Sequence, residues 1–444
     1  MTKDADVIVI GAGAAGLAAA AQLGRAGLSV LILEARDRIG GRMFTEHDPA
    51  CPYPIELGAE FIHGLAPEIW QPLQKAGVNI AEITGQPWCV ENNRICPCDF
   101  FDEVDDILKK MDEKAPDESF LSFLQRCCPT ANAKAKQRAL GYVTGFNAAD
   151  PGLVGVHWLV QGMKAEETIE GHRAFRAKQG YAGFVEILRR DLPGSVTLRT
   201  EVIVDSILWK PGHVEISAGS DLNFFADRAI ITLPLAVLQA PPGTRGTIAF
   251  DPGLPSQKLK AMEKLEMGKV MRVVLRFRQR FWETISPAKN KTLADMSFLF
   301  ANDEWFPTWW TTMPDQFPII TGWAPFQSAD RLSGQNRNFV VGRAAETLGA
   351  LLGYSSAKVQ AELEAAYFHD WQSDPFSRGA YSYGKVGSDG AQSLLGAPVE
   401  NTLFFAGEAT DVSGHNGTVH GAIASGRRAA AEIVSGLNLA RRPA

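Results

Sequence analysis

Short runs of apolar residues, separated by glycine turns and mixed polar stretches, recur along this chain. The first run, Val7–Ile10, leads into the turn Gly11–Gly16. An alanine-rich stretch to about Ala26 favours a helix, and a second apolar run, Val30–Leu33, ends at Glu34. The pattern predicts a strand, a tight turn, a helix and a second strand at the start of the chain.

The rest of the chain mixes helical and strand patterns. Stretches in which charged residues and alanines mix predict helices, and short apolar runs predict strands. No linker rich in Ser, Gly or charge divides them, and no internal repeat is present. In chain order the predicted elements are helices at Asp102–Lys114 and Ala131–Gly141, strands within Ser195–Trp209, at Ala229–Pro234 and at Gly268–Trp282, and a strand at Leu403–Gly407 followed by a helix at Gly421–Gly436.

The glycine turn has the spacing of a dinucleotide-binding site. Gly11, Gly13 and Gly16 permit a tight turn and the close approach of a pyrophosphate, with Ala15 in the same turn. The helix that begins there directs its partial positive end and free N–H groups at the phosphates. Glu34 ends the second strand, where it can accept hydrogen bonds from a ribose. We expect these five residues to bind a dinucleotide.

The residues from Glu34 to Arg42 resemble the second-strand signature of the flavin-containing amine oxidase superfamily. This superfamily includes polyamine oxidases, monoamine oxidases and flavin-type lysine demethylases. The resemblance implies that FAD is the cofactor and that Arg36, Gly41 and Arg42 surround its pyrophosphate. Glycine permits close approach, and guanidinium groups supply planar donors for phosphate oxygens. A solvated turn after a strand is the alternative.

A second segment, Phe404–Thr410 followed by Gly417–Ala422, resembles the superfamily's C-terminal FAD segment. The resemblance implies that Glu408 lies beside the ribityl–pyrophosphate part and that the following helix directs its N-terminus at the flavin N1–C2 carbonyl. Further cofactor contacts are implied for Gly58, Ala59, Glu60, Phe61, Val202, Thr418 and Val419. For Val202, expected at the adenine, a plain core valine is the alternative.

The matching segments lie at both ends and in the middle of the chain. We therefore predict the α/β class, with a Rossmann-like FAD-binding domain interleaved with an α+β substrate-binding domain. The expected FAD-binding domain comprises residues 1–75, 190–245 and 395–444. The expected substrate-binding domain comprises residues 76–189 and 246–394 and contains a helical insertion.

The stretch from Trp371 to Tyr383 resembles the segment before the amine site of polyamine oxidases and lysine demethylases. The resemblance implies that Tyr381 faces the flavin beside the substrate nitrogen, and that Trp371 supports the same site. Thr418 stands where monoamine oxidases place a second tyrosine. A ring face attracts a cation and leaves the lone pair of a neutral amine free. Core packing of both aromatics is the alternative.

Two further positions refine this expectation. Ala380 stands where monoamine oxidases carry the cysteine that bonds the flavin, so we expect FAD to be held non-covalently. Phe61–Gly64 is close to the sequence that brings a histidine to the substrate channel of animal polyamine oxidases. His63 can therefore hydrogen-bond the amine or steer its protonation, or it can be a structural histidine.

Arg272 departs from the superfamily. It stands where an active-site lysine usually holds a water at flavin N5 and is linked to the reaction with oxygen. Arginine can hold a water and offer positive charge, but it cannot lose its proton at working pH. On a regular strand Arg272 shares a face with Val270, Val274 and Arg276 and can instead face solvent.

The resemblance implies an FAD-dependent amine oxidase. Hydride transfer from the amine α-carbon to flavin N5 gives an imine that hydrolyses to an aldehyde, and oxygen reoxidises the flavin to give hydrogen peroxide. A polyamine or another primary or secondary amine is the expected substrate. An L-amino acid oxidase stays an alternative, although Phe61 stands near the position of the carboxylate-binding arginine in those enzymes. A desaturase or mutase, or a non-enzymatic scaffold with the same fold, is the other alternative.

Composition bounds the class of protein. The chain has 444 residues, 45% of them hydrophobic, and a net charge of −6 without a long basic run, so no nucleic-acid partner is expected. No apolar run reaches about 18 residues, and no basic stretch precedes the first strand. We therefore expect a cytoplasmic protein that does not enter a membrane, a monomer or homodimer, whose partners are the amine and oxygen.

Cysteines, histidines and some acidic residues complete the sequence picture. The six cysteines and eight histidines show no metal-ligand spacing, so we expect no metal and, in the cytoplasm, reduced thiols. Glu60, Glu166, Glu167 and Glu170 can attract a polyamine, but solvated surface is the preferred interpretation of the last three.

Overall fold

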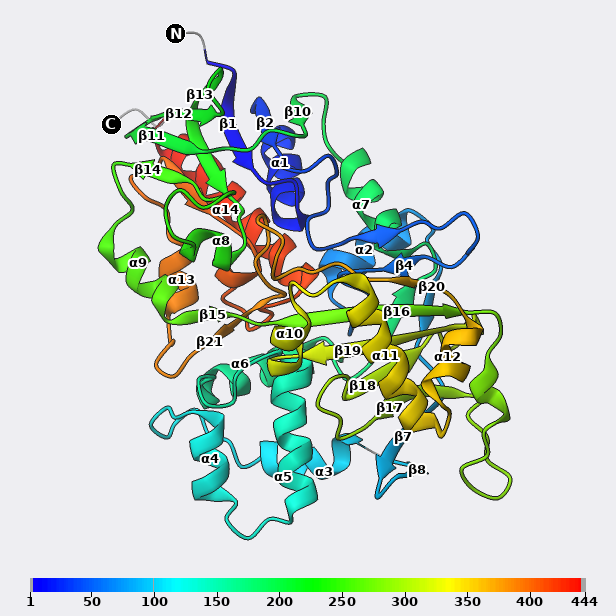
Figure 1. Ribbon diagram of the computed structural model, residues 1–444. Helices are drawn as coiled ribbons and strands as arrows, with labels where there is room; N and C mark the ends of the chain where they lie inside the picture. Colours follow the sequence, from blue (N-terminus) through cyan, green and yellow to red (C-terminus); the bar gives the residue numbers. More distant parts are fainter. Residues whose placement is uncertain (1–2, 99, 441–444) are drawn as a thin grey trace.

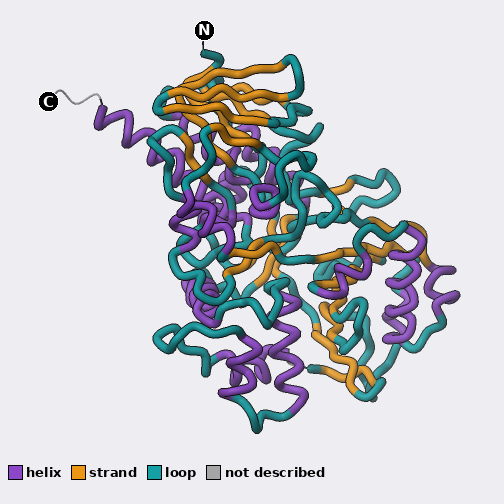
Figure 2. The backbone as a smooth tube through the Cα atoms, turned by 60° about the vertical axis from the view of Figure 1, so that its left-hand side comes forward, coloured by secondary structure: helices purple, strands orange, loops and turns teal. Residues whose placement is uncertain are grey.

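Two large β-sheets, each covered by helices, make up most of the molecule (Figures 1 and 2). The structure is a computed structural model that describes residues 3–98 and 100–440. The eight-stranded sheet gathers at one end of the molecule, beside the first and last helices, and the seven-stranded sheet lies in the other half. The predicted α/β class is confirmed.

The eight-stranded sheet has a parallel centre built from both ends and the middle of the chain. The apolar runs near the N-terminus pair with each other, with Val7 opposite Val30. Their residues are almost all buried, which explains why they are continuous and apolar rather than alternating. The parallel strands are β1 (Ala5–Ile10), β2 (Val30–Leu33), β10 (Val196–Arg199), β13 (Leu222–Ile231) and β22 (Leu403–Phe405); β11 (Ser206–Lys210), β12 (His213–Ala218) and β14 (Ala249–Asp251) extend the sheet beyond β13.

Small residues bring the first and last helices together against this sheet. α1 (Ala14–Arg25) packs on α14 (Val419–Ala440), and α7 (Gly180–Arg190) packs on α1. At the contact, a Cβ on Gly426 would overlap the carbonyl oxygen of Ala15. Glycine is therefore required for this close approach.

The seven-stranded sheet contains a strand whose successive side chains point to opposite faces and are almost all buried. In β16 (Val270–Phe277), the side chains of Met271, Val273 and Leu275 join the apolar core. The other strands, in spatial order from one edge with β16 second, are β20 (Leu363–Tyr367), β19 (Ile319–Pro325), β18 (Thr308–Thr311), β17 (Met296–Phe300), β7 (Gln86–Glu91) and β8 (Arg94–Pro97). The helices α10 (Gln327–Leu332), α11 (Arg337–Leu352) and α12 (Ser356–Glu362) lie along this half of the molecule (Figure 1).

A group of helices forms the end of the molecule opposite the eight-stranded sheet (Figure 1). It comprises α3 (Phe100–Leu108), α4 (Phe120–Cys127), α5 (Ala133–Gly141), the π-helix η1 (Tyr142–Phe146) and α6 (Val156–Thr168). The shorter elements are β3 (Thr45–Glu46), β4 (Ile55–Glu56), β5 (Ile62–His63), α2 (Pro67–Lys75), β6 (Ile80–Glu82), β9 (Ala174–Ala177), α8 (Leu235–Gln239), α9 (Ser256–Glu263), β15 (Leu265–Met267), η2 (Phe281–Thr284), β21 (Ser382–Gly384), α13 (Ala391–Gly396) and η3 (Glu408–Thr410).

The predicted elements are present, with different ends. The strand predicted over 268–282 stops at Phe277, because Phe281 and Trp282 turn into a short 3-10 helix whose rings pack into the core. The helix predicted over 102–114 ends at Leu108. Two elements outside the predicted FAD-binding segments pack with that half: β14 joins its sheet and α7 joins its core. The domain boundaries themselves stay a prediction.

The expectation of reduced thiols is wrong for two of the six cysteines. Cys89 and Cys98 form a disulfide, with Cα atoms 5.5 Å apart. The β7–β8 hairpin creates this pairing, because it sets Cys89 opposite Cys96 and brings the residues that follow β8 alongside. Spacing along the sequence does not reveal a contact that depends on hairpin register. The free cysteines are Cys51, Cys96, Cys127 and Cys128.

Candidate active site

The residues expected at the cofactor lie along one edge of the eight-stranded sheet. Gly11 follows β1, Glu34 follows β2, Thr232 follows β13 and Gly407 lies just beyond β22. These strands run parallel, so their carboxyl ends meet on the side where open α/β sheets bind ligands. Val202 reaches the same edge, where its N–H donates to the carbonyl of Glu34 over 2.9 Å.

The glycine turn before α1 is tightly packed on the protein side and open on the other. A Cβ on Gly16 would overlap the carbonyl oxygen of Gly11, and Ala15 is buried beside it. A Cβ on Gly13, by contrast, would meet no protein atom within 4 Å, and one on Gly41 would touch the Cα of Gly13 at 3.4 Å. The open face of Gly13 leaves room for a phosphate at the helix N-terminus.

Two carboxylates order the predicted pyrophosphate site: Glu34 binds backbone N–H groups, and Asp374 pairs with the Arg36 side chain. The buried Glu34 carboxylate accepts the N–H groups of Ala12 (2.8 Å) and Arg36 (3.0 Å). The Arg36 guanidinium pairs with Asp374 at 2.8 Å, and Asp374 is also hydrogen-bonded to His369. Burial opposes ionisation of Asp374, but the bonds from His369 and Arg36 outweigh it and lower the pKa of this carboxyl. A segment far along the chain therefore positions Arg36.

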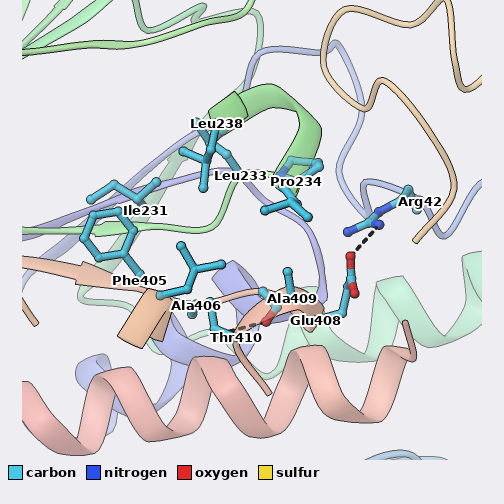
Figure 3. Close-up of a pocket in the computed structure, with 13 residues that line it drawn as sticks. Arg42, Ile231, Leu233, Pro234, Leu238, Phe405, Ala406, Glu408, Ala409 and Thr410 are labelled. Carbon is cyan, nitrogen blue, oxygen red and sulfur yellow. Dashed lines mark hydrogen bonds and ion pairs between the residues drawn. The ribbon is translucent and has the colours of Figure 1, made fainter. Parts of the chain in front are cut away.

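Arg42 and Glu408 join the two FAD-like segments (Figure 3). The Arg42 Nη1 donates to Glu408 Oε1 over 3.0 Å and to the carbonyl of Ala380 over 2.7 Å. Glu408 is buried and also accepts from the Ser382 hydroxyl (2.6 Å) and the Gly417 N–H (2.9 Å). A pocket lies beside this ion pair, lined mainly by apolar residues near the carboxyl ends of β13 and β22.

Arg38 supplies a further donor at the glycine turn. Its Nη1 donates to the carbonyl of Gly41 over 2.8 Å, and its guanidinium lies over the ring of Phe44. Its Nη2 is buried without a hydrogen-bond partner among the described residues. Burial and the nearby Arg36 lower the pKa of Arg38 to about 10, which leaves it charged at neutral pH. A buried, unpartnered guanidinium nitrogen beside an open glycine turn fits an anionic ligand such as the FAD pyrophosphate.

The loop Gly58–Phe61 is fixed on the Arg42 segment. A Cβ on Gly58 would overlap the carbonyl oxygen of Arg42, and the Ala59 N–H donates to the same oxygen over 3.0 Å. On its other side, a Cβ on Gly58 would lie 3.2 Å from the ring of Trp371. The loop is therefore held between Arg42 and Trp371.

Trp371 packs against the loop that carries Gly58. Its Nε1 donates to the carbonyl of Leu57 over 2.8 Å, and its ring contacts His369 and Phe44. Among the described residues, no ring contact joins it to Tyr381. The Trp371 side chain therefore supports the Gly58 loop.

Tyr381 is held through both of its neighbours in the chain. Ala380 accepts from Arg42, and Ser382 donates to Glu408. The Tyr381 hydroxyl donates to the carbonyl of Phe146 over 2.7 Å. Burial raises the pKa of this hydroxyl, so it stays protonated and keeps its donor role.

Thr418 caps the N-terminus of α14. Its Oγ1 accepts from the Gly421 N–H over 3.0 Å and donates to the carbonyl of His415 over 2.7 Å. The helix begins at Val419. A threonine at this position satisfies a helix N–H, so the hydroxyl expected opposite Tyr381 is already engaged.

Six ring-bearing side chains make up what we call the aromatic cluster; five are joined by ring contacts, and Tyr381 is joined by its hydrogen bond to the carbonyl of Phe146. The six are Phe61, His63, Phe146, Trp310, Trp323 and Tyr381. Ring-centroid distances of 5.3, 6.1, 5.4 and 5.7 Å join Phe146, His63, Phe61, Trp310 and Trp323 in that order. Trp323 closes the series, because its Nε1 donates to the carbonyl of Gly145 over 3.0 Å, next to Phe146.

The π-helix η1 supplies two of these contacts. The carbonyl of Gly145 accepts from Trp323 and that of Phe146 accepts from Tyr381. The Phe146 ring stacks on Tyr142 at 5.5 Å. Single π-turns are uncommon and occur often at functional sites.

Glu60 is the charged centre next to this cluster. Its Oε1 accepts from Arg176 Nε over 2.6 Å, and its Oε2 accepts from Arg272 Nη2 and from Trp310 Nε1 (3.1 Å). Arg272 also donates to the carbonyl of Gly58 over 2.6 Å. Arg272 is only 3% exposed, so the solvent-facing alternative is wrong. Burial lowers the pKa of Arg272 to about 10, which still leaves it protonated near neutral pH.

The histidines near the cluster are neutral at physiological pH. Burial lowers the pKa of His63 to about 4. Burial, together with the nearby His415 and His63, lowers the pKa of His420 to about 3. In the part of the chain that the structure describes, no group of three His, Cys, Asp or Glu side chains is placed to hold a metal ion.

Glu166 differs from the neighbouring acidic residues. Glu167 and Glu170 are exposed, in line with a solvated surface. Glu166 is half-buried on α6, and burial raises the pKa of its carboxyl to about 7. Its charge also contributes to the raised pKa of Tyr142, after burial. The surface interpretation is therefore wrong for Glu166.

The family follows from a comparison over nearly the whole chain. A family model described as flavin containing amine oxidoreductase matches residues 14–126 and 109–434. The chain belongs to this family. It is therefore a flavoprotein that oxidises amines, and FAD is its cofactor.

Curated relatives of this flavin-containing amine oxidoreductase share modest identity over long alignments. A probable polyamine oxidase 4 from Arabidopsis thaliana is 28% identical over 95% of this chain and 85% of that protein. Polyamine oxidase 3 from Oryza sativa subsp. japonica is 26% identical over 96% and 88%. A lysine-specific histone demethylase 1 homolog 3 from Arabidopsis thaliana is 28% identical over 96% of this chain but 30% of its own length.

Solved structures share the fold of this oxidoreductase. Wild-type putrescine oxidase bound to putrescine matches with a TM-score of 0.80 at 21% identity, over 97% of this chain and 99% of that one. Cyclohexylamine oxidase from Brevibacterium oxydans IH-35A matches with a TM-score of 0.78 at 20% identity, over 98% and 100%. Separately, none of the helices described for residues 3–98 and 100–440 has the length and apolarity to cross a membrane.

Sequence reasoning missed three residues that shape the site of this oxidoreductase: Arg176, Trp310 and Asp374. Arg176 carried a signal, because it is an arginine within the apolar strand β9, and a buried arginine requires partners. Trp310 follows Trp309, and nothing in the sequence says which of the two reaches the site. Asp374 lies within the recognised segment, but its partner Arg36 is 338 residues away.

Proposed function

We propose that this oxidoreductase oxidises a primary or secondary amine beside Tyr381, with oxygen as the final acceptor. One observation carries the proposal: Tyr381 is fixed through Ala380 and Ser382 to Arg42 and Glu408, the residues that join the two FAD-like segments. The ring is thereby tied to the elements expected to hold the cofactor. This supports a role for Tyr381 in orienting the substrate nitrogen.

The chain's own side chains supply orientation and charge. FAD, held by the glycine turn and Arg42, would supply the redox chemistry: it would take hydride from the amine α-carbon, water would hydrolyse the resulting imine to an aldehyde, and oxygen would reoxidise the cofactor to give hydrogen peroxide. Tyr381 offers a ring face to the amine, and neutral His63 can accept a hydrogen bond from it. Arg272 provides fixed positive charge beside the Gly58 loop. Ala380 has no nucleophile, which supports non-covalent FAD.

The L-amino acid oxidase alternative is weakened because the buried Arg176 and Arg272 already pair with Glu60. Arg176 uses its three nitrogens on Glu60, Thr311 and Met313. Arg272 uses both Nη atoms on Gly58 and Glu60. Among the described residues Arg272 Nε is buried without a partner, but a substrate carboxylate bound there would compete with Glu60 for the same buried positive charge.

The test is anaerobic mixing of the purified holoenzyme with alkylamines, benzylamine, putrescine, spermidine and a basic L-amino acid. We expect at least one amine to bleach the oxidised flavin band, and readmitted air to restore it with formation of hydrogen peroxide. The amino acid should leave the band unchanged. If no amine bleaches a demonstrably bound flavin, the proposal fails. A cytoplasmic location and a monomeric or homodimeric state belong to the same proposal.

A further inference from the structure

The charges beside the aromatic cluster are already paired with one another. Both oxygens of Glu60 are engaged, Oε1 by Arg176 and Oε2 by Arg272 and Trp310. Glu60 is buried to a similar degree as the two arginines, at 9% side-chain exposure against 7% and 3%. A substrate ammonium group would therefore have to share this carboxylate with two guanidinium groups that are already bonded to it.

If Glu60 turned to a substrate ammonium group, a buried arginine would lose its ion pair. Arg176 would keep its bonds to the carbonyls of Thr311 and Met313 but would lose its counter-charge in a buried position. Breaking a buried ion pair on one side leaves an uncompensated charge and is strongly unfavourable. A second ammonium group therefore gains nothing by competing for Glu60.

The other groups near Arg272 do not supply a free anion. Glu56 accepts from the Tyr181 N–H and the Thr45 hydroxyl, and burial raises the pKa of its carboxyl to about 7. His63 is neutral. Glu60 is thus the carboxylate that both guanidinium groups contact directly, and its charge is already balanced before a substrate binds.

The other side chains of this neighbourhood are aromatic. The rings of Phe146, His63, Phe61, Trp310 and Trp323 follow one another, and the series reaches Tyr381 at the carbonyl of Phe146. Ring faces accommodate one cationic or neutral nitrogen together with hydrocarbon, whereas a second ammonium group in such surroundings is costly without a partner.

We propose that the preferred substrate is an apolar amine with a single nitrogen, such as an alkylamine, cycloalkylamine or arylalkylamine, rather than a diamine or polyamine. The proposal rests on the amine oxidation proposed above. The sequence allowed a polyamine or another primary or secondary amine, with Glu60 among the residues that could attract a polyamine; the pairing of Glu60 with two arginines favours the single amine.

The experiment compares amines that differ by one nitrogen. Hexylamine and 1,6-diaminohexane, and butylamine and putrescine, are mixed anaerobically with the holoenzyme, and the rate of flavin bleaching is measured against concentration. We expect the second-order rate constant of each monoamine to exceed that of its diamine by about tenfold or more, the effect of one poorly compensated charge.

The outcomes separate the two proposals. Diamines that react as fast as the monoamines, or faster, would overturn the single-nitrogen preference while supporting amine oxidation; Glu166, beyond Tyr142, would then be the carboxyl to examine. Bleaching by none of the amines, with flavin bound, would overturn the proposed function and this inference together.

A variant tests the assignment to Glu60. Arg176→Met frees Oε1 of Glu60 and should lower the monoamine-to-diamine ratio of rate constants by about tenfold. Arg176→Lys keeps the charge and should keep most of the ratio. Arg173→Met is the matched control, because Arg173 lies three residues away and pairs with the exposed Glu82 and Glu170. A folded, flavin-loaded Arg176→Met protein with an unchanged ratio would overturn the role given to Glu60.

Discussion

At the scale of single residues, Arg272 is the most consequential side chain in the site. It is buried, charged and bonded to the loop that holds Gly58 and Glu60. A lysine in its place would have one nitrogen for these contacts, whereas the guanidinium reaches two partners at once. The positive charge is thus fixed in position rather than mobile.

Replacing Arg272 by methionine is expected to slow the reaction of the reduced enzyme with oxygen by about tenfold or more, because a fixed positive charge stabilises a developing superoxide. Anaerobic reduction by the amine should change less. Stopped-flow measurement of the two half-reactions checks this, with Arg272→Lys as the charge-conserving control. Equal slowing of both half-reactions would argue for a structural role instead.

The lowered pKa of His63 leads us to expect that the stability of the protein depends on pH. Its pKa is about 4 in the folded protein, below its ordinary value of 6.5. As pH falls below 6.5, the unfolded chain takes up a proton that the folded protein refuses until about pH 4, so stability falls across this window. His63→Gln should therefore lose less stability than the wild type between pH 7 and 5, by up to about 2 kcal/mol.

The measurement is denaturant unfolding at several pH values. His213→Gln is the control, because His213 is exposed on β12 and should leave the pH dependence unchanged. Parallel pH profiles for the wild type and His63→Gln would contradict burial of a neutral histidine.

At the scale of elements, the contact between α1 and α14 depends on one glycine. Gly426→Ala places a Cβ against the backbone of Ala15 and should destabilise the protein by about 1–3 kcal/mol, the range for overpacking. FAD binding should weaken as well, because α1 begins at the glycine turn. Gly342→Ala in α11 is the matched control: no atom lies within 4 Å of its Cβ, so it should be neutral or stabilise by up to about 1 kcal/mol.

Thermal unfolding and flavin titration of both variants check this prediction. A Gly426→Ala protein as stable as Gly342→Ala would show that the two helices can separate without cost.

The disulfide of the β7–β8 hairpin can be tested by counting free thiols. With Cys89 and Cys98 joined, the unfolded, unreduced chain should show the four thiols named above, and six after reduction. Cys98→Ser should cost about 2–3 kcal/mol of stability, the chain-entropy value for a short loop. Cys96→Ser, which removes a free thiol of the same hairpin, is the control. Six thiols without reductant would refute the disulfide.

At the scale of the whole molecule, the cofactor edge is assembled from distant parts of the chain. Gly13, Arg42, Val202 and Glu408 come from the N-terminal, middle and C-terminal segments, and the sheet order places them on one side. A ligand held by all of them binds only the folded chain.

Removal of FAD is therefore expected to lower the thermal midpoint. Restoring free FAD to about 100 times its dissociation constant should return about 2.7 kcal/mol of stability. Differential scanning measurements across a series of FAD concentrations check this. If the thermal midpoint does not change with FAD concentration, FAD does not bind the folded chain across these segments.

Local sequence patterns were enough to predict the secondary-structure elements of the cofactor half and the motifs that resemble the family. β1, the glycine turn, α1 and β2 could be predicted because each depends on residues within a few positions: apolar runs, small residues and turn glycines. The α/β class followed from their alternation, and FAD followed from the resemblance of two segments, Glu34–Arg42 and Phe404–Ala422, to those of the amine oxidase superfamily.

Which buried charges pair with each other depends on the folded chain. Glu60 pairs with Arg176, 116 residues away, and with Arg272, 212 residues away. The same holds for the ring contacts of Trp310 and for the disulfide of Cys89. Such partners are selected by sheet register and by the cost of burying an unpaired charge, and neither is encoded in a local pattern.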